Sequence, residues 1–459
     1  MTVADQPDAP DRAAPQASGT TAPVVRAEAV IDLTAIAANT RLLLTRMREV
    51  NPRAELMAVV KADGYGHGAV PSARGALAGG AGFLGVATPQ EALELRAAGI
   101  DAPVLAWLWP AGQDIAPALA AGVEMGISSL DHLTAVLAAR STGRQPRIHV
   151  KIDTGLGRNG VGPRELGAVL DAVAAAERSG RVAVAGLMSH LASADVPDDP
   201  SVAEQTLAFR AALGLAASKG IQARWHHLAN TPAVLDHPDT FFDMGRCGIG
   251  LYGINPVLTP AGLRPAMTLR GTVALTKRVP ADHGVSYGLT YRTATETTLA
   301  LVPLGYADGI PRAASSVGEV WLRGRRRRIA GRVAMDQVVV DCGDDPVEAG
   351  DDVVVFGPGD AGEPTADDWA AACGTIAYEI VTRIGPRVPR RYLGEGPEVT
   401  ESIGGVRDLG VSMGRGEALA GGSDNDRDND RGNDRGNDRD GSDRGNDRHG
   451  SDGDPGGNR

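Results

Sequence analysis

The chain has 459 residues, a formal net charge of −11 and a hydrophobic fraction of 42%. This length exceeds what one hydrophobic core usually organises, so we expect two domains, and the negative charge argues against a general binder of nucleic acid or anionic membrane. No run approaches the ~18 consecutive apolar residues of a membrane-spanning helix, and the three widely spaced cysteines favour a reducing cytoplasm over a disulfide framework.

The two ends of the chain have compositions that cannot form a core. Residues 1–25 are rich in proline and alanine and lack the apolar stretch of a secretory signal, which predicts a disordered leader. Residues 396–459 become dominated by aspartate, asparagine, arginine and glycine, most strongly after Ser423, which predicts a disordered low-complexity tail.

Between these ends, short β-prone runs first alternate with alanine- and leucine-rich stretches of helical period. The β-prone runs are Leu56–Val60, Phe83–Ala87, Val104–Trp109, Glu124–Ser128, Arg147–Asp153, Val182–His190, Arg224–Leu228 and Phe242–Arg246. The helical stretches include Ala69–Ala78, Pro89–Ala98, Leu130–Ala139, Arg164–Arg178 and Val202–Ser218. Eight such repeats predict an α/β fold, a (β/α)8 barrel of the TIM type over residues 26–262.

After the barrel repeats the sequence pattern changes to short β-prone runs rich in valine, glycine and proline. The strands are Thr298–Pro303, Glu319–Leu322, Val338–Cys342 and Asp352–Phe356. They predict a smaller C-terminal β-domain over residues 263–395. The strand-like segment Ala27–Leu33 precedes the barrel repeats, so it is free to pair with this second domain. Four consecutive arginines, Arg325–Arg328, predict a solvated hairpin turn, and a nucleic-acid-binding patch is the alternative.

Lys61 stands where an apolar run ends and the glycine-rich segment Ala62–Gly68 begins. An amine at the end of a buried strand is held by rigid backbone and is partly stripped of water, and such a lysine can form a Schiff base with an aldehyde. The alternative for any lone lysine is an exposed surface position. Lys61 is therefore the first candidate for a catalytic amine.

Polar residues also lie at the ends of several later strands. They are Lys151, Arg158, His190, His227, Asn230 and Arg246. In a barrel, catalytic groups gather at the carboxyl ends of the strands, so we expect these side chains and Lys61 to share one rim. Gly248 and Ile249 follow Arg246 in a glycine-rich segment whose backbone amides can face an anion. The sequence therefore predicts a cationic site with a place for a phosphate group.

The segment from Val24 to Tyr392 resembles the bacterial alanine racemases, and the motifs of that family recur in their usual order. The matching segments are Val59–Gly68, Lys151–Gly160, Ser189–Asp195, His227–Thr231, Arg246–Gly253, Val285–Gly288, Val302–Arg312, Gly331–Gln337 and Thr375–Tyr392. The resemblance implies an N-terminal barrel, a C-terminal β-domain and a head-to-tail homodimer whose active sites are shared between chains. It also implies pyridoxal 5'-phosphate as the cofactor, bound to Lys61 as in other fold-type III enzymes.

The resemblance implies a role for individual residues, motif by motif. The cofactor phosphate would be held by Tyr65, Asn230, Thr231, Gly248, Ile249 and Tyr378. Arg246, supported by His190, would face the pyridine nitrogen, and Arg158 would face the phenolic oxygen. Lys151 occupies a position that is carbamylated in some relatives, where it braces the arginine that corresponds to Arg158.

Racemisation removes a proton from one face of Cα and delivers another to the opposite face, so two positioned groups are expected. The resemblance implies Lys61 for one face and Tyr287, in a Val-Ser-Tyr-Gly motif of the partner chain, for the other. It places the substrate carboxylate between Arg158 and the backbone amide of Met335 from the partner chain. The narrow entrance to the site would be lined by Tyr306, Arg312, Asp195 and Tyr378.

The implied function is that of an isomerase, an alanine racemase that interconverts L-alanine and D-alanine and supplies D-alanine for peptidoglycan. A cation at Arg246 disfavours a proton on the pyridine nitrogen, which suppresses side reactions. It also argues against a basic amino-acid decarboxylase, because those enzymes place a carboxylate there. A racemase for serine or for several amino acids stays open, as does a non-catalytic pyridoxal-phosphate carrier, although a carrier has no need of Tyr287. No metal, nucleic acid or membrane partner is expected.

Overall fold

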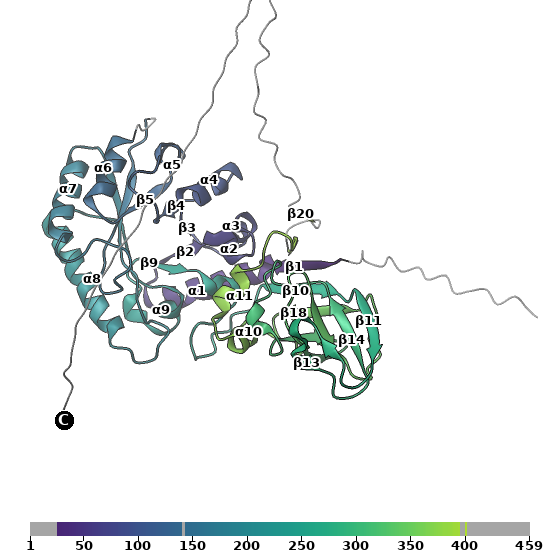
Figure 1. Cartoon of the computed structure of the whole chain (residues 1–459). Coiled ribbons are helices and arrows are strands. Elements are labelled where there is room, and N and C mark those ends of the chain that lie inside the picture. Colours follow the sequence, from purple (N-terminus) through teal and green to yellow (C-terminus); the bar gives the residue numbers. More distant parts are fainter. Residues whose placement is uncertain (1–24, 140–142, 395–399, 402–459) are drawn as a thin grey trace, which may run out of the picture. The chain divides into compact units, whose positions relative to one another are not determined.

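The computed structural model describes residues 25–139, 143–394 and 400–401 (Figure 1). The chain divides into two units, residues 1–405 and 406–459, and every element described below belongs to the first. Nearly all of the predicted leader and of the predicted tail lies outside the described residues. The predicted limits of the barrel and of the β-domain stay predictions.

Eight parallel strands form the barrel that the sequence predicts. They are β2 (Glu55–Val59), β3 (Phe83–Val86), β4 (Val104–Ala106), β5 (Glu124–Ile127), β6 (Arg147–Lys151), β7 (Ala183–Met188), β8 (Trp225–His227) and β9 (Met244–Cys247). Their order in the sheet is β8-β7-β6-β5-β4-β3-β2-β9. The end strands approach each other, because the amide of Asp243 donates to the carbonyl of His226 (3.0 Å) and the amide of Arg246 to that of Ala229 (2.9 Å). The barrel is therefore nearly closed, and the carboxyl ends of its strands meet at one rim.

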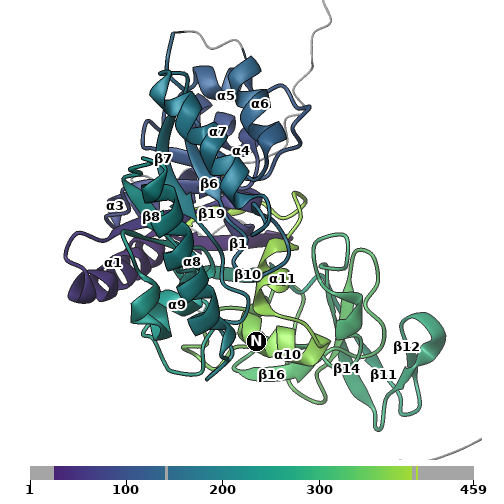
Figure 2. The ribbon, with the colours of Figure 1, turned by 90° about the vertical axis from the view of Figure 1, so that its left-hand side faces the viewer.

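Helices connect these strands and lie on the outside of the sheet (Figure 2). They are α1 (Leu33–Val50), α2 (Lys61–Tyr65), α3 (Ala69–Ala78), α4 (Pro89–Ala97), α5 (Ala116–Ala120), α6 (Leu130–Ala138), α7 (Leu166–Arg178), α8 (Ser201–Ser218) and α9 (Thr231–Asp236). Helix α4 begins with a capping box, in which Thr88 and Glu91 each accept a backbone amide of the other. Helix α1 is absent from the predicted pattern, and it begins where the side chain of Asp32 accepts two backbone amides. Within the described ranges, no helix has the length and apolar character needed to cross a bilayer.

The remaining strands form a seven-stranded sheet with the order β16-β15-β18-β10-β1-β19-β20, and two smaller sheets, β11-β14-β17 and β12-β13. The large sheet contains β1 (Ala27–Asp32), β10 (Met267–Thr272), β15 (Glu319–Leu322), β16 (Arg325–Arg328), β18 (Asp352–Phe356), β19 (Arg390–Leu393) and β20 (Thr400–Glu401). The smaller sheets contain β11 (Leu275–Val279), β12 (Gly284–Val285), β13 (Tyr291–Arg292), β14 (Thr297–Val302) and β17 (Val338–Asp341). Two helices, α10 (Ala366–Cys373) and α11 (Ala377–Thr382), complete this part of the chain.

Strand β1 lies inside the large sheet, although it precedes the whole barrel in the sequence (Figure 1). It runs antiparallel to β10, where Ala29 pairs with Leu269, and parallel to β19, where Ala29 pairs with Arg390. The first strand-like segment therefore pairs with strands that follow the barrel in the sequence.

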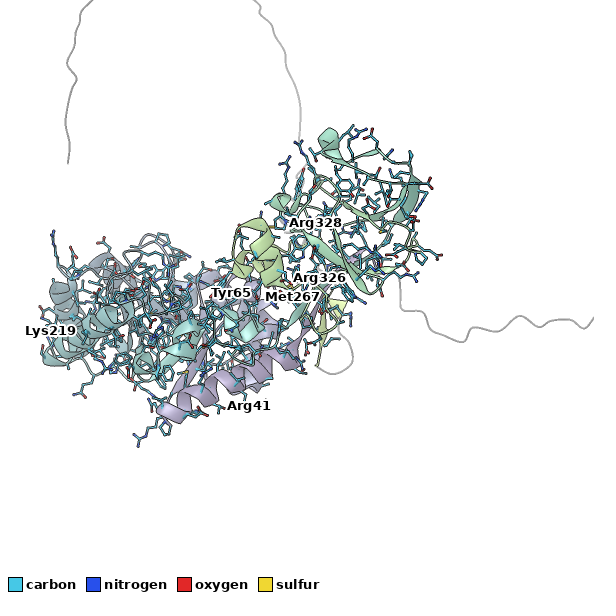
Figure 3. The ribbon with its side chains drawn as sticks, turned by 90° about the horizontal axis from the view of Figure 1, so that it is seen from below. Arg41, Tyr65, Lys219, Met267, Arg326 and Arg328 are labelled. Carbon is cyan, nitrogen blue, oxygen red and sulfur yellow. The ribbon has the colours of Figure 1, made fainter. Side chains whose placement is uncertain are left out.

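The four consecutive arginines form strand β16, so the prediction of a hairpin turn is wrong. The turn lies one step earlier, at Arg323 and Gly324, which have positive φ angles of 52° and 77°. Arg327 points inward and is buried, because its guanidinium donates to the carbonyl of Cys342 (3.1 Å) and pairs with a carboxylate. Arg326 and Arg328, labelled in Figure 3, remain exposed on the same strand. A strand can therefore tolerate four arginines when its one buried position is fully paired.

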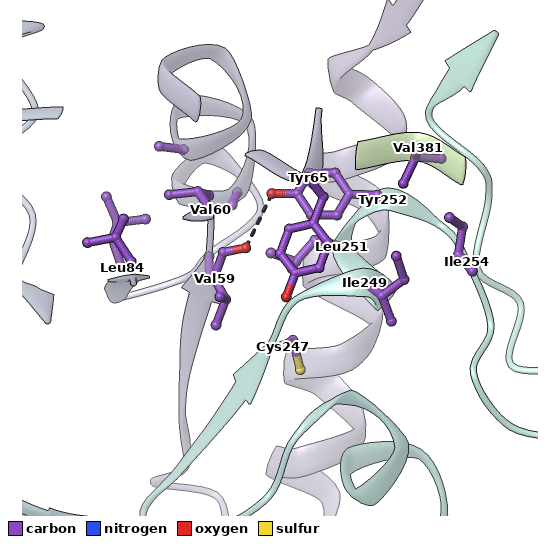
Figure 4. Packing of buried hydrophobic residues seen from close by; sticks show 14 of the residues in the cluster. Val59, Val60, Tyr65, Leu84, Cys247, Ile249, Leu251, Tyr252, Ile254 and Val381 are labelled. Carbon is purple, nitrogen blue, oxygen red and sulfur yellow. Dashed lines mark hydrogen bonds between the residues drawn. The ribbon is translucent and has the colours of Figure 1, made fainter. Parts of the chain in front are cut away.

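Apolar residues pack tightly where the turn after β2 meets the segment after β9 (Figure 4). The rings of Tyr65 and Tyr252 lie 5.1 Å apart, and the hydroxyl of Tyr252 donates to the carbonyl of Val59 (3.2 Å). Cys247 and Val381 belong to the same buried cluster. This packing fixes the first and the last strand of the barrel to each other at the rim where the predicted site residues gather.

Candidate active site

A cavity of about 840 Å³ opens at the carboxyl ends of the barrel strands. The predicted residues that line it are Lys61, Tyr65, Lys151, Arg158, His190, Asn230, Thr231, Arg246, Gly248, Ile249 and Tyr378. Tyr378 comes from α11, whereas the others lie at the ends of barrel strands or in the segments that follow them. The structure therefore brings the predicted lysine, arginines, histidine and phosphate-binding residues to one cavity.

Lys61 begins a short left-handed turn rather than a normal helical turn. Ala62, Asp63 and Tyr65 have φ angles of 51°, 52° and 53°, a conformation that side chains with a Cβ rarely adopt. Each such residue costs on the order of 1–3 kcal/mol, so the turn persists only because its surroundings hold it. Part of that support is the carboxylate of Glu91, which accepts the amide of Ala62 (2.7 Å).

The C-terminal part of the chain supplies the rest of that support. The buried guanidinium of Arg390 donates to the carbonyl of Gly66 through two nitrogens, at 3.1 and 3.0 Å. A Cβ at Gly66 would overlap the backbone of Val381, and one at Gly68 would overlap the hydroxyl of Tyr392. The turn that carries Lys61 is therefore clamped between the barrel and segments more than three hundred residues later in the chain.

The electrostatic surroundings of Lys61 favour its neutral amine. Burial and, after it, the positive charge of Arg158 lower its pKa below the ordinary value, although Glu91 opposes this shift. Arg158 makes no hydrogen bond or ion pair within the described residues and lines the same cavity. An unpaired guanidinium beside this amine is suited to bind an anion close to the lysine.

Hydroxyl and amide donors converge on the other side of the cavity. The rings of Tyr65 and Tyr378 lie 6.3 Å apart, and burial is the main cause that raises the pKa of both hydroxyls, which therefore stay protonated. A Cβ at Gly248 would overlap the hydroxyl of Tyr65, so only glycine lets that hydroxyl lie so close to the backbone. The amide of Gly248 donates to the hydroxyl of Thr231 (3.1 Å). Neutral donors of this kind fit a phosphate group.

Arg246 is buried, and its two terminal nitrogens make five contacts. They reach Nδ1 and the carbonyl of His227 (3.1 and 2.8 Å), the carbonyls of Ser189 (2.6 Å) and Leu228 (3.0 Å), and Nδ1 of His190 (3.2 Å). Burial lowers the pKa of Arg246 to about 10, which still leaves it charged at neutral pH. Burial and then the charge of Arg246 keep the pKa of both histidines well below the ordinary value, so both rings are neutral.

Lys151 lines the same cavity as Arg158 and donates to the carbonyl of Asn159 (3.1 Å). Burial, followed by the charges of Arg246 and Arg158, lowers its pKa to about 8. An appreciable fraction of this amine is therefore neutral, and hence nucleophilic, near physiological pH.

Five predicted site residues do not line the cavity of their own chain. They are Asp195, Tyr287, Tyr306, Arg312 and Met335. Tyr287, Met335 and Tyr306 lie in the β-domain segment and expose 70%, 52% and 44% of their surface. Asp195 acts on the cavity indirectly, because its charge is among the causes that raise the pKa of Tyr378.

Other cavity residues were not predicted from the sequence. Strand β4 ends at Ala106, so the rest of this apolar run lies beyond the strand, where Trp107, Leu108 and Trp109 line the cavity. His132 also lines it, and its ring lies 4.4 Å from that of Trp109. The signal that could have indicated these residues is the length of the run Val104–Trp109, which exceeds that of the strand.

The chain combines a nearly closed barrel with a β-domain, and its strained lysine turn lies beside cationic and neutral donors. These features define a two-domain barrel enzyme built around a buried amine. Comparison with known families assigns it further. The model of the alanine racemase N-terminal domain matches residues 31–256, and that of the C-terminal domain matches residues 266–392. The chain belongs to the alanine racemase family.

Individual relatives agree with this assignment. The chain is 55% identical over 371 residues to an alanine racemase of Thermobifida fusca, covering 80% of this chain and 98% of the relative. It is 53% identical over 387 residues to that of Streptomyces coelicolor, covering 81% and 97%. The crystal structure of alanine racemase from D-cycloserine-producing Streptomyces lavendulae has a TM-score of 0.78 and 52% identity, covering 81% of this chain and 98% of that one. The predicted family, fold class and enzyme class, an isomerase, are thereby confirmed.

Proposed function

We propose that the protein interconverts L-alanine and D-alanine with pyridoxal 5'-phosphate held at Lys61, as a cytoplasmic homodimer that supplies D-alanine for peptidoglycan. Membership of the alanine racemase family supports the reaction. The observation that carries the site assignment is the meeting of Lys61, Arg158 and Arg246 in one cavity.

The residues of the cavity fit this cofactor. An aldehyde needs an amine, which is Lys61, and a phosphate needs neutral or cationic donors, which the hydroxyls of Tyr65, Tyr378 and Thr231 provide. Because residue 248 has no Cβ, the hydroxyl of Tyr65 can lie close to the backbone of this segment, which gathers neutral donors at one place in the cavity. When bound, pyridoxal phosphate supplies an electron sink that makes the Cα proton of an attached amino acid acidic.

Two of the chain's residues move the proton in this proposal. Lys61, with its lowered pKa, takes or gives a proton at one face of Cα. Tyr287 of the partner subunit acts at the opposite face. Its 70% exposure in its own chain supports this role, because a tyrosine that serves another subunit has to project from its own fold.

Other residues bind and orient the reacting groups. Arg158 and the backbone amide of the partner subunit's Met335 would bind the substrate carboxylate. Arg246 can donate but cannot accept, so it disfavours a proton on the ring nitrogen that it faces. His190 accepts from Arg246 and keeps it in place. The entrance would be formed by Asp195, Tyr306, Arg312 and Tyr378.

We also propose that Lys151 is carbamylated, because an amine with a pKa of about 8 reacts readily with carbon dioxide. A carbamate there would place a negative charge beside Arg158. Incubation with ¹³C-bicarbonate should give a carbamate signal in ¹³C NMR that disappears in Lys151→Met and persists in Lys277→Met, which alters an exposed lysine. A signal that persists in Lys151→Met would contradict this assignment.

Chiral analysis of L-alanine incubated with the cofactor-loaded protein tests the reaction. Drift to equal amounts of the two enantiomers is expected, and unchanged L-alanine would overturn the proposal. Parallel reactions with L-serine separate a narrow from a broad racemase. Tyr287→Phe should keep the cofactor bound and lose most L-to-D turnover. Tyr291→Phe is the control and should keep its turnover, because the hydroxyl of Tyr291 donates to Asp341 of its own chain (2.6 Å).

A further inference from the structure

Four buried side chains form a continuous hydrogen-bonded row through the interior of the barrel. Oε2 of Glu124 lies 2.7 Å from Nε2 of His149, and Nδ1 of His149 lies 2.9 Å from Nε2 of His227. Nδ1 of His227 in turn lies 3.1 Å from a terminal nitrogen of Arg246. Glu124 opens β5, whereas Arg246 lies near the end of β9, so the row joins the two ends of the barrel.

The direction of every hydrogen bond in this row is determined by its ends. A guanidinium can only donate, so Nδ1 of His227 accepts and its Nε2 carries the proton. Nδ1 of His149 therefore accepts from His227, and Nε2 of His149 carries a proton that it donates to Glu124. Both imidazoles are neutral Nε2–H tautomers, and all the N–H bonds of the row point toward the carboxylate.

This arrangement provides a counter-charge for a buried cation. Arg246 is 5% exposed and forms no ion pair with a carboxylate of the described residues. Aligned hydrogen bonds polarise one another, so the negative charge of Glu124 strengthens the hold of His227 on Arg246. Glu124 keeps its charge because, although burial raises its pKa, hydrogen bonds from His149 and Arg147 lower it below the usual value.

The row crosses a strand, and a glycine makes that crossing possible. His149 lies on β6 and His227 on β8, with β7 between them. The residue of β7 that pairs with His149 is Gly186, and a Cβ there would overlap Nδ1 of the imidazole. Any other residue at this position would push His149 away from His227, so strand β7 is locally shaped to let the two rings meet.

We propose that Glu124, His149 and His227 are positioning residues that hold Arg246 in one orientation toward the cofactor ring, from the far end of the barrel. The row itself is independent of the proposed function, and only its effect on the reaction rests on that function. None of these three residues has to touch substrate or cofactor, because each acts through Arg246.

The first test measures the tautomers in the full-length wild-type protein. Histidine labelled with ¹⁵N, observed by long-range ¹H–¹⁵N correlation near neutral pH and assigned by single His→Gln substitutions, distinguishes Nδ1–H, Nε2–H and doubly protonated rings. We expect Nε2–H for both His149 and His227. An Nδ1–H or a doubly protonated ring at either residue would overturn the proposal, whatever the activity of the protein.

The second test removes the carboxylate with Glu124→Leu. We expect both rings to keep the Nε2–H tautomer, because Arg246 still determines it, and the ¹⁵N shift of Nε2 of His149 to move because its N–H loses the acceptor. In the same variant kcat for alanine should fall on the order of tenfold to a hundredfold, with KM changed little. Arg147→Gln is the matched control, because it removes the 50% exposed partner of the same carboxylate and leaves the row intact. It should keep the tautomers and stay within about twofold in kcat.

The third test blocks the crossing with Gly186→Ala and uses Gly167→Ala, a helical glycine with nothing within 4 Å, as its control. Only the former should lower kcat and change the spectra of the two histidines. Unchanged kcat and spectra in both Glu124→Leu and Gly186→Ala would refute the positioning role. If wild-type protein fails to racemise alanine, the proposed function is wrong, but the histidine tautomers of the wild-type protein still show whether the row exists. The same wild-type measurement decides the question if Glu124→Leu does not fold.

Discussion

Replacing Arg390 with methionine should loosen the turn that carries Lys61 and destabilise the whole fold. The guanidinium is 4% exposed and donates to carbonyls on both sides of the contact between the barrel and the C-terminal segment. It reaches the carbonyls of Gly66 (3.1 and 3.0 Å), Ile384 (2.5 Å), Gly385 (2.7 Å) and Val388 (2.8 Å). Methionine has a similar length but no donor, so it isolates the loss of these hydrogen bonds from a loss of volume.

The magnitude follows from the carbonyls that are left without a donor. Gly385 keeps the amide of Val388 at 3.2 Å, whereas Gly66, Ile384 and Val388 accept no other hydrogen bond outside regular elements of the described chain. A buried acceptor without a partner costs about 1–3 kcal/mol. Three such carbonyls give roughly 3–6 kcal/mol once some entry of water is allowed for.

Urea unfolding followed by tryptophan fluorescence measures this loss, and Arg387→Met is the matched control. Arg387 is 44% exposed and pairs with Asp308 and Asp336, so its loss should cost less than about 1 kcal/mol. The Arg390→Met variant should also bind pyridoxal phosphate more weakly, because Lys61 lies on the loosened turn. Equal unfolding midpoints for the two variants would refute the reasoning.

Three further predictions use matched pairs or pH. Gly66→Ala should destabilise the fold by at least ~2 kcal/mol more than Gly99→Ala, because both positions have left-handed φ (82° and 76°) but only the former methyl meets backbone. Arg327→Leu should cost roughly 2–4 kcal/mol and Arg328→Leu less than ~0.5 kcal/mol, as only the first is buried and paired. Since the pKa of Lys151 falls from 10.5 to about 8, cofactor-free wild-type protein should gain up to roughly 3 kcal/mol over Lys151→Met between pH 8 and 10.5.

Denaturant midpoints check each comparison. For Lys151 the sign follows from proton binding, because between these two pH values the unfolded chain binds the proton that the folded chain has released, so stability rises with pH. The measurement has to exclude carbon dioxide, which would carbamylate the amine. Equal losses at the two glycines, equal losses at the two arginines, or a pH-independent difference would each contradict the corresponding prediction.

Much of the barrel and of its rim could be predicted from the sequence because both depend on local patterns. Short apolar runs with helical stretches between them determine strands, and the carboxyl end of a parallel strand is a defined place in a barrel. Lys61, Lys151 and Arg246 could therefore be assigned to one rim before their distances were known. The motifs of the family added the roles that periodicity alone cannot assign.

The contacts that escaped prediction depend on register between distant segments. Nothing near Arg390 indicates that it reaches Gly66, because the two positions meet only when β19 lies beside β1. His149 and Glu124 lie inside runs that read simply as strands, and their hydrogen bonds depend on which strand face points into the barrel. Arg327 was misjudged because a run of like charges usually stays in solvent, whereas two carbonyls and one carboxylate suffice to bury one of them.

The position of β1 has a consequence for how the chain matures. This strand leaves the ribosome before any barrel strand, yet both of its neighbours, β10 and β19, follow the barrel in the sequence. At ordinary rates of synthesis it waits on the order of tens of seconds for them. A fragment that starts after α1 retains all barrel strands but leaves β10 and β19 with open edges, which are sites for pairing with other chains. The first strand thus protects the last-made sheet from aggregation.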